Sequence, residues 1–313
     1  MEDFAYAIMS EVAEGSEANI TAQSFEVAES SLVHDTLSHY CDVNALQAIL
    51  NKRTFRATRL DSQKLNDKYE AKRKDLEKIC GSFFITCFTH HPCEIVPFWM
   101  NYGGSNLKKK VMLRFKNFAS NFQDNIIPGY CTASNGLKVY LEGNEFYQAI
   151  KIQRSALQNG ITYELFSDFD LRACIQRTSL CDIKYLPISD EVFSQRNKHN
   201  VSFVINKEGE TLDLPTYFPD SLGKHKTVHW AHEDETRIIV QLFPYEQHYF
   251  DYIDIPFREE ILRNLEIVLS PWCSKNEKRN IREIVSSASI DGNMKATIDI
   301  HDSELYDQIN MKK

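Results

Sequence analysis

Two glutamates and an arginine recur at two-residue spacing in the segment VHWAHEDETRIIV, residues 228–240. The β-branched run at its end predicts a strand that enters a sheet. Because successive strand side chains point to opposite faces, Glu233, Glu235 and Arg237 would project from one face. Two close carboxylates repel each other, and a neighbouring arginine would favour their ionised forms. The pattern therefore indicates either the floor of an active site or an exposed ladder of ion pairs.

A second group of chemically capable residues lies in CFTHHPC, residues 87–93. Its cysteines and histidines are metal-ligand types, but their spacing matches no closed structural zinc site. A cysteine in a buried strand is also more often a small apolar residue than a ligand. We therefore expect no metal. The chain shows no phosphate-binding loop, dinucleotide-binding glycine pattern or nucleophile elbow.

Composition limits the class of protein. The 313 residues carry a net charge of −8, with 42% hydrophobic and 26% charged residues. This acidic balance argues against broad binding to nucleic acid or anionic membranes. The acidic start is unlike a secretory signal, and no apolar run approaches the about 18 residues of a membrane span. Eight scattered cysteines are unlike a small disulfide scaffold. A cytoplasmic protein with no membrane partner is predicted.

The elements that must position these residues follow from the spacing of apolar side chains. Between residues 36 and 60, TLSHY predicts a strand, DVNALQAILNK a helix capped by Asp42, and TFRATRL a second strand. Further along, GSFFITCFT and KKVMLRF predict strands on either side of a short helix in EIVPFWMNYGG, and SKNEKRNIREIVSSA predicts a final helix. Because helices and strands do not alternate regularly, the predicted class is α+β.

The chain is expected to contain three parts. Residues 1–33 predict a helical and polar arm outside the core, which could contact a protein partner. Residues 34–290 predict a single α+β domain with a helical insertion at about 117–180. Residues 291–313 are expected to form a C-terminal tail.

An ordered set of motifs resembles a bacterial family known as domain of unknown function 2971. The counterparts in this chain are HYCDVNALQAILNKRTF, LNDKYE, TCFT, WMNYGG, WAHEDETRI and LEIVLSPWCSKNE, between about residues 37 and 285. The chain departs from the family pattern at Cys41, where Thr is usual, and at Lys68, where Pro is common. The family name carries no activity, so this resemblance implies no function.

The order of a His-containing strand, a helix, further strands and a late strand bearing Glu is also similar to ADP-ribosyltransferases. This similarity exists at the level of fold only. It implies a split, mixed or antiparallel sheet, with NAD as the substrate. Carried over to this chain, it implies His39 as the ribose ligand, Phe88 or Tyr102 as the aromatic on nicotinamide, and Glu235 as the catalytic carboxylate, with Glu233 orienting the acceptor.

Two more aromatic residues belong to the candidate NAD site. Tyr40 follows His39 directly, and Trp99 precedes Tyr102 by three residues, so on a helix the last two would share a face. For Trp99 and Tyr102, core packing is the alternative to a place in the pocket wall. His39 could likewise be a structural histidine instead of a ligand.

Three functions stay open. The first is an NAD-dependent ADP-ribosyltransferase, which the resemblance implies to be a bacterial toxin or antiphage effector. The second is a non-catalytic module of a defence system that binds a nucleotide or a protein. The third is a Mg²⁺-dependent nuclease, which would need Asp67 close to Glu233 and Glu235. The transferase hypothesis requires that His39 and Glu235 line one cleft on adjacent central strands.

Overall fold

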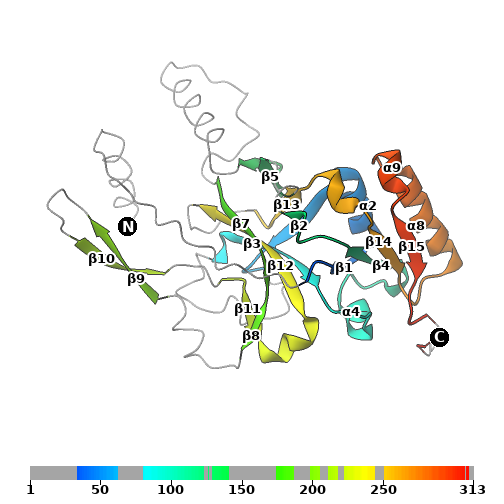
Figure 1. The fold of residues 1–313 in the computed structure, drawn as a ribbon, viewed down its shortest axis with the longest axis horizontal. Coiled ribbons are helices and arrows are strands. Elements are labelled where there is room, and N and C mark those ends of the chain that lie inside the picture. Colours follow the sequence, from blue (N-terminus) through cyan, green and yellow to red (C-terminus); the bar gives the residue numbers. More distant parts are fainter. Residues whose placement is uncertain are drawn as a thin grey trace, which may run out of the picture. The chain divides into compact units, whose positions relative to one another are not determined.

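The computed structural model describes residues 34–62, 80–122, 126, 129–140, 174–186, 198–204, 211–217, 222–243, 250–306 and 308–309. The predicted N-terminal arm at 1–33 and the NDKYE segment at 66–70 lie outside these residues. Within the described part, helices and strands are interspersed and the fold is α+β, as predicted (Figure 1).

Most of the described strands form one mixed sheet. Its order is β15-β14-β4-β1-β3-β2-β13-β5-β6, and β12 joins the free edge of β3 to β7. Neighbours are antiparallel except β14 and β15, which are parallel. The strands are β1 Leu37–Asp42, β2 Thr54–Arg59, β3 Phe83–Thr89, β4 Lys110–Phe115, β5 Tyr130–Ala133, β6 Lys138–Tyr140, β7 Cys174–Asp182, β12 Glu235–Phe243, β13 Tyr252–Pro256, β14 Glu266–Leu269 and β15 Asp299–Asp302.

Two small sheets lie outside this order. Strands β9 (Lys198–Val204) and β10 (Thr211–Tyr217) pair antiparallel. Strands β8 (Lys184–Leu186) and β11 (His225–Thr227) pair parallel. Strand β11 is followed in the chain by the 3₁₀-helix η4 (Val228–Glu233) and then by β12. These three elements carry residues of the candidate site.

The predicted strand–helix–strand at the start of the domain is confirmed. The Asp42 side chain accepts a hydrogen bond from the Ala45 N–H at 2.8 Å, which caps helix α2 (Val43–Lys52). The helix ends at Arg53 in the left-handed conformation. Its apolar stripe, Val43, Leu46, Ile49 and Leu50, is buried in the main core.

The two faces of β1 pack on different helices. Leu37 and Cys41 enter the main core with α2, whereas Tyr40 packs on the opposite face against Phe98 and Trp99. These two aromatic residues belong to the short helix α4 (Val96–Asn101). Helices α2 and α4 therefore cover opposite faces of this part of the sheet (Figure 1).

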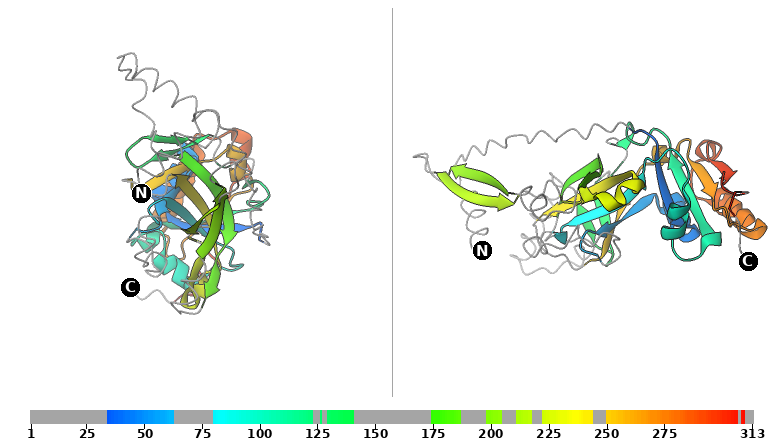
Figure 2. Two further views of the ribbon diagram at one scale, coloured as in Figure 1. Left: turned by 90° about the vertical axis from the view of Figure 1, so that its left-hand side faces the viewer. Right: turned by 90° about the horizontal axis from the view of Figure 1, so that it is seen from below.

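The C-terminal residues do not form the tail predicted for 291–313. Helix α9 (Gly292–Lys295) follows α8 (Lys275–Ser287), and β15 then adds a parallel strand to β14; these elements are orange and red in Figure 2. Ser303 Oγ donates to Glu94 Oε2 at 2.6 Å, and the Glu304 N–H donates to Glu94 Oε1 at 3.0 Å. The prediction was wrong because β15, DIHD, is polar and largely exposed, so its sequence carries little strand signal.

The structure leaves the helical insertion predicted at about 117–180 untested, because its helical segment falls outside the described residues. Strands β5 and β6 and most of β7 occupy this part of the chain. Residues 141–173, which include the predicted helix NEFYQAIKIQRSAL, lie outside the described residues.

The sheet divides at β3. Strand β12 pairs with β3 from Phe83 to Thr89 along one edge. On the other edge, β2 pairs with Phe84 and Ile85, and β1 pairs with Thr89. Residues 86–88 therefore face the opening between β1 and β2.

Candidate active site

A cavity of about 320 Å³ lies at this opening. Its walls come from β1, β2 and β3, from the end of α4, from β11, and from the start of β12. His39 and Glu235, which belong to separate sequence motifs, both line this one cavity. The shared cavity meets one part of the requirement, but the two strands are not adjacent, because β1 and β12 each pair with β3.

Glu235 is placed by the alternation of β12. Thr236, Ile238 and Val240 are buried on one face, with Ile238 and Val240 in the main core, while Glu235 and Arg237 project from the other face. The register pairs Glu235 with Thr89 and Arg237 with Cys87 of β3. The carboxylate thus stands at the first residue of the strand, beside the opening in the sheet.

Glu233 does not lie on this strand, contrary to prediction. It ends η4, and Asp234 then adopts a left-handed conformation with φ of 41°, so the chain turns before β12 begins. Aspartate tolerates this region better than most residues. The end of β3 fixes the turn, because Thr89 Oγ1 donates to the Glu233 carbonyl at 2.7 Å and the His90 N–H donates to the Asp234 carbonyl at 2.9 Å.

The exposed ion-pair ladder is excluded. Glu233, Glu235 and Arg237 are only 3%, 4% and 1% exposed. Arg237 binds Glu235 through two bonds, Nε to Oε1 at 2.7 Å and Nη2 to Oε2 at 3.1 Å, and its Nη1 donates to the Gly223 carbonyl at 2.8 Å. This is a bidentate pair removed from solvent, which is a strong and specific arrangement.

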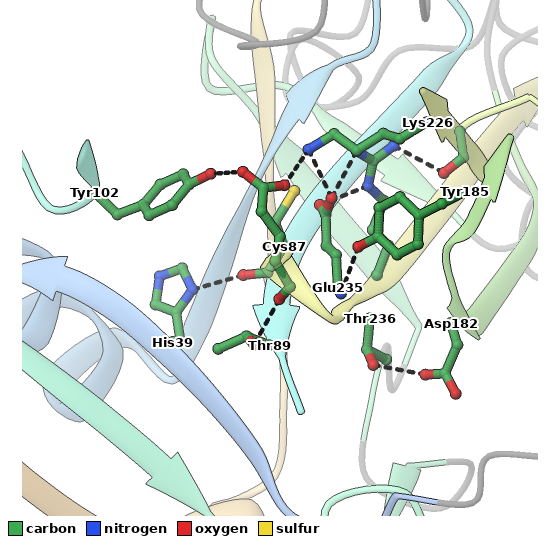
Figure 3. A network of polar contacts seen from close by, with 12 residues as sticks. His39, Cys87, Thr89, Tyr102, Asp182, Tyr185, Lys226, Glu235 and Thr236 are labelled. Atoms are coloured by element: carbon green, nitrogen blue, oxygen red, sulfur yellow. Dashed lines mark hydrogen bonds and ion pairs between the residues drawn. The ribbon is translucent and has the colours of Figure 1, made fainter. Parts of the chain in front are cut away.

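Lys226 joins the two carboxylates and was not identified from the sequence. Its Nζ lies 2.5 Å from Glu233 Oε2 and 2.8 Å from Glu235 Oε2 (Figure 3). The side chain is 6% exposed, and Nζ also lies 5.3 Å from the centre of the Trp230 ring. Lys226 stands on β11, before η4, whereas Glu233 ends η4 and Glu235 begins β12. No strand or helix period connects it to them.

The charges in this network balance. Two carboxylates face one ammonium and one guanidinium. Burial alone would raise the pKa of Glu235, but Arg237 and Lys226 outweigh burial and lower that pKa to about 2. Glu235 is therefore ionised at neutral pH inside the cavity.

The low pKa of Glu235 links its ionisation to stability. The ordinary value is 4.5 and the folded value is about 2. The unfolded chain therefore binds more protons in this interval. We expect the stabilisation from ionised Glu235 to be complete above about pH 5 and to be lost as the pH falls through 4.5 toward 2, by about 3 kcal/mol in total. Urea unfolding at pH 6 and pH 3 measures this loss. Glu235→Gln, which cannot titrate there, should lose less over the same interval, and equal losses would contradict the assignment.

His39 supplies a polar group on the other wall. Its Nδ1 lies 2.9 Å from the Cys87 carbonyl oxygen, which can only accept, so Nδ1 carries the proton. Burial lowers the pKa of His39, although the bond to Cys87 partly opposes this effect. The neutral ring then has Nε2 as its acceptor. His39 therefore bonds to the sheet through Nδ1, and Nε2 is its acceptor nitrogen in the cavity wall.

Of the aromatic residues predicted for the site, Tyr102 hydrogen-bonds to one of the carboxylates. It follows α4, lines the cavity, and donates from its hydroxyl group to Glu233 Oε1. The next residue, Gly103, has φ of 74°, and a Cβ there would meet the Cys41 carbonyl carbon and oxygen at 2.8 Å. Only glycine allows this close approach to β1, which brings Tyr102 to the cavity.

The other aromatic candidates differ in whether they line the cavity. Tyr40 and Phe88 line the cavity, and both are mostly buried. Trp99 does not line it, so its predicted role in binding NAD is wrong. Trp99 is fully buried, packs edge-on against Tyr40 at 4.9 Å, and donates from Nε1 to Glu94 Oε2 at 3.0 Å. Trp99 is therefore a core residue, as the alternative predicted, because helix α4 packs its ring against Tyr40 of β1.

Among the described residues, one group brings three potential metal ligands within 4.8 Å of one another: His34, His90 and Asp182. The two imidazole rings are stacked at 4.1 Å with an angle of 3° between their planes. Imidazole binds a metal in the plane of its ring, and one ion cannot lie in two parallel planes. His90 Nδ1 instead approaches Thr236 Oγ1 at 3.0 Å, and Thr236 donates to Asp182 at 2.6 Å. This group does not identify a metal centre.

Comparison with protein-family models, with curated proteins and with solved structures found no match. Across the described helices, none combines the length and apolar character needed to cross a membrane.

Proposed function

We propose that the cavity binds NAD and that the chain is an ADP-ribosyltransferase-like enzyme. The observation that carries this proposal is that an ionised, buried glutamate and a neutral histidine line the same cavity at the opening of the sheet. Perturbed ionisable groups that converge in a cavity are a recognised sign of a catalytic site.

The dimensions of the cavity fit one end of a dinucleotide. Its volume of about 320 Å³ is at the small end of the range for ligand sites, which is about 300–1,000 Å³. A second cavity of about 380 Å³ shares His39 and Arg56 with the first and includes Lys52. We assign the nicotinamide ribose to the first cavity and the phosphates to the second, where Lys52 could contact them. Arg56 in that cavity already binds Asp254 through two hydrogen bonds.

NAD would supply a glycosidic bond whose cleavage leaves positive charge on the ribose carbon. Glu235 is ionised and held in place, so it can stabilise that charge without reorganisation. His39 Nε2 can accept a hydrogen bond from a ribose hydroxyl, and the Tyr102 ring can contact nicotinamide. Glu233 would orient the acceptor. In the balanced reaction, nicotinamide leaves with the bonding electrons, the acceptor bonds to the ribose carbon, and the acceptor's proton is released.

A second candidate is a non-catalytic module that binds a nucleotide. One observation favours it: both oxygens of Glu235 already bind Arg237 or Lys226. A carboxylate neutralised in this way stabilises a new positive charge less than a free one would. The nuclease is not proposed, because the Lys226 ammonium lies between the carboxylates that would hold Mg²⁺, and Asp67 lies outside the described residues.

Thermal unfolding with added NAD tests binding. A ligand that binds only the folded chain stabilises it by about 2.7 kcal/mol at 100 times its Kd. We expect millimolar NAD to raise the melting temperature by several degrees, and AMP at equal concentration to raise it less. Release of nicotinamide, followed by chromatography, then separates an enzyme from a binding module. An unchanged melting temperature with NAD would contradict the proposal, and a shift with AMP alone would favour the module.

A further inference from the structure

The two buried carboxylates of the cavity raise an electrostatic question. Glu233 and Glu235 are each under 5% exposed and approach the same ammonium group. Two carboxylates that share a buried site ordinarily cannot both ionise, and one of them keeps a proton. A protonated Glu233 could not orient an acceptor, and a protonated Glu235 could not stabilise positive charge.

Lys226 is the cation that contacts both members of the pair. Arg237 binds Glu235 from within β12, whereas Lys226 reaches Glu233 at 2.5 Å and Glu235 at 2.8 Å from β11. The parallel pairing of β11 with β8 fixes the backbone of Lys226. The ammonium is thus held between two carboxylates that come from different elements.

The other titratable groups around the two carboxylates do not offset their negative charge. Cys87 of β3 and Tyr185 of β8 face Glu235, and burial raises the pKa of each, so both are neutral at pH 7. The Tyr185 hydroxyl accepts from the Glu235 N–H at 2.8 Å. Tyr102 donates to Glu233 from the end of α4, and His39 of β1 is neutral because burial lowers its pKa.

We propose that Lys226 is a positioning residue that keeps Glu233 and Glu235 ionised together and fixes the two carboxylates at separate places in the cavity. The structural part of this inference concerns the protein alone. Its catalytic part rests on the proposed function, in which the two carboxylates have different tasks. Without the ammonium, Glu235 would still have Arg237 beside it, but Glu233 would lose the cation that contacts it and would keep the bond from the Tyr102 hydroxyl group.

The first test is a titration of the carboxylates, which needs neither NAD nor activity. Glutamate side chains labelled with ¹³C report each pKa by NMR, with Glu233→Gln and Glu235→Gln used for assignment. In the wild type, Glu235 should stay ionised below the ordinary value of 4.5. In Lys226→Met, which keeps the length of the side chain, the pair of carboxylates should take up its first proton at a higher pH than in the wild type. Lys226→Arg should restore the low value.

A matched control is Lys110→Met. Lys110 is also a buried lysine, at 1% exposed, but its Nζ donates to the carbonyls of Trp99 and Met100 at 2.7 and 3.2 Å. This variant should lose stability and leave both carboxylate titrations unchanged. If Lys226→Met does not fold, the wild-type titration still decides, because a Glu235 that titrates at or above 4.5 in the wild type overturns the proposal.

Kinetics test the catalytic part. We expect Lys226→Met to reduce kcat/KM for transfer by about 10²-fold at neutral pH. The loss should shrink as the pH rises, because the pair of carboxylates then ionises without help. An unchanged titration of the pair in Lys226→Met, together with a pH-independent activity loss, would refute the inference and leave the proposed function standing. A shifted titration in a wild type that neither binds nor cleaves NAD would refute the proposed function alone.

Discussion

Replacing Glu235 with Gln is expected to reduce turnover of NAD by about 10²–10³-fold, the effect of losing one group that stabilises developing charge. Glutamine keeps the size of the side chain but cannot offset positive charge on the ribose carbon. The same change should also destabilise the fold by about 3–5 kcal/mol, because Arg237 and Lys226 would lose a buried counter-charge. On sequence alone, relief of repulsion between Glu233 and Glu235 predicts unchanged or higher stability; the position of Lys226 between them reverses that expectation.

The activity loss must be separated from the stability loss. Glu94→Gln is a suitable control, because Glu94 is 8% exposed, lies outside the cavity wall, and binds Trp99, Ser303 and the Glu304 N–H. It should lose stability and keep turnover when both variants are assayed well below their melting temperatures. Full turnover in a folded Glu235→Gln variant would end the transferase hypothesis.

The parts of the fold that could be predicted are those specified by local signals. The helix after β1 has a capping aspartate and apolar residues at 3.6-residue spacing, and both features act within a few residues. Strand β3 is a continuous buried run, and β12 alternates between a core face and a polar face. In contrast, β15 is a polar edge strand that forms only because β14 is already in place.

The site was predictable only in part because it is assembled from distant segments. Tyr102 and Glu233 are 131 residues apart in sequence, and His39 and Cys87 are 48 apart. The two-residue period of a strand could predict that Glu235 and Arg237 share a face, because both lie on one strand. Glu233 enters the same network because Asp234, in the left-handed conformation, turns the chain before the strand begins. The two-residue period of a strand does not predict this turn.

Lys226 shows the same limit more sharply. Its contacts depend on a parallel pairing of β11 with β8, which no local sequence signal encodes. The ion network is therefore a tertiary feature, and its energetic consequences differ from those of a surface ladder. A buried charge pair contributes little net stability over apolar residues, but removal of one partner leaves an uncompensated charge. This asymmetry leads to the second large effect.

Replacing Arg237 with Met is expected to destabilise the fold by about 3–5 kcal/mol. Arg237 is 1% exposed, and its loss would leave Glu235 with Lys226 as its cation and the Gly223 carbonyl without this donor. The double variant Glu235→Gln/Arg237→Met removes both charges of the pair and leaves Lys226 with Glu233. Its cost should therefore be smaller than the sum of the two single costs, by about 1–3 kcal/mol.

The control for this cycle is a chemically similar pair near the surface. Arg56 binds Asp254 through two bonds at 2.9 and 3.1 Å, but the arginine side chain is 54% exposed. The cycle Arg56→Met and Asp254→Asn should give a coupling below about 1 kcal/mol, because solvent screens the pair. Urea unfolding of the four single variants and two double variants measures both couplings. If Arg237→Met cost no more than Arg56→Met, the Glu235–Arg237 pair would behave as a solvated one. Glu235 would then have no need of Lys226 to remain ionised, and the buried network could not be the basis of a catalytic site.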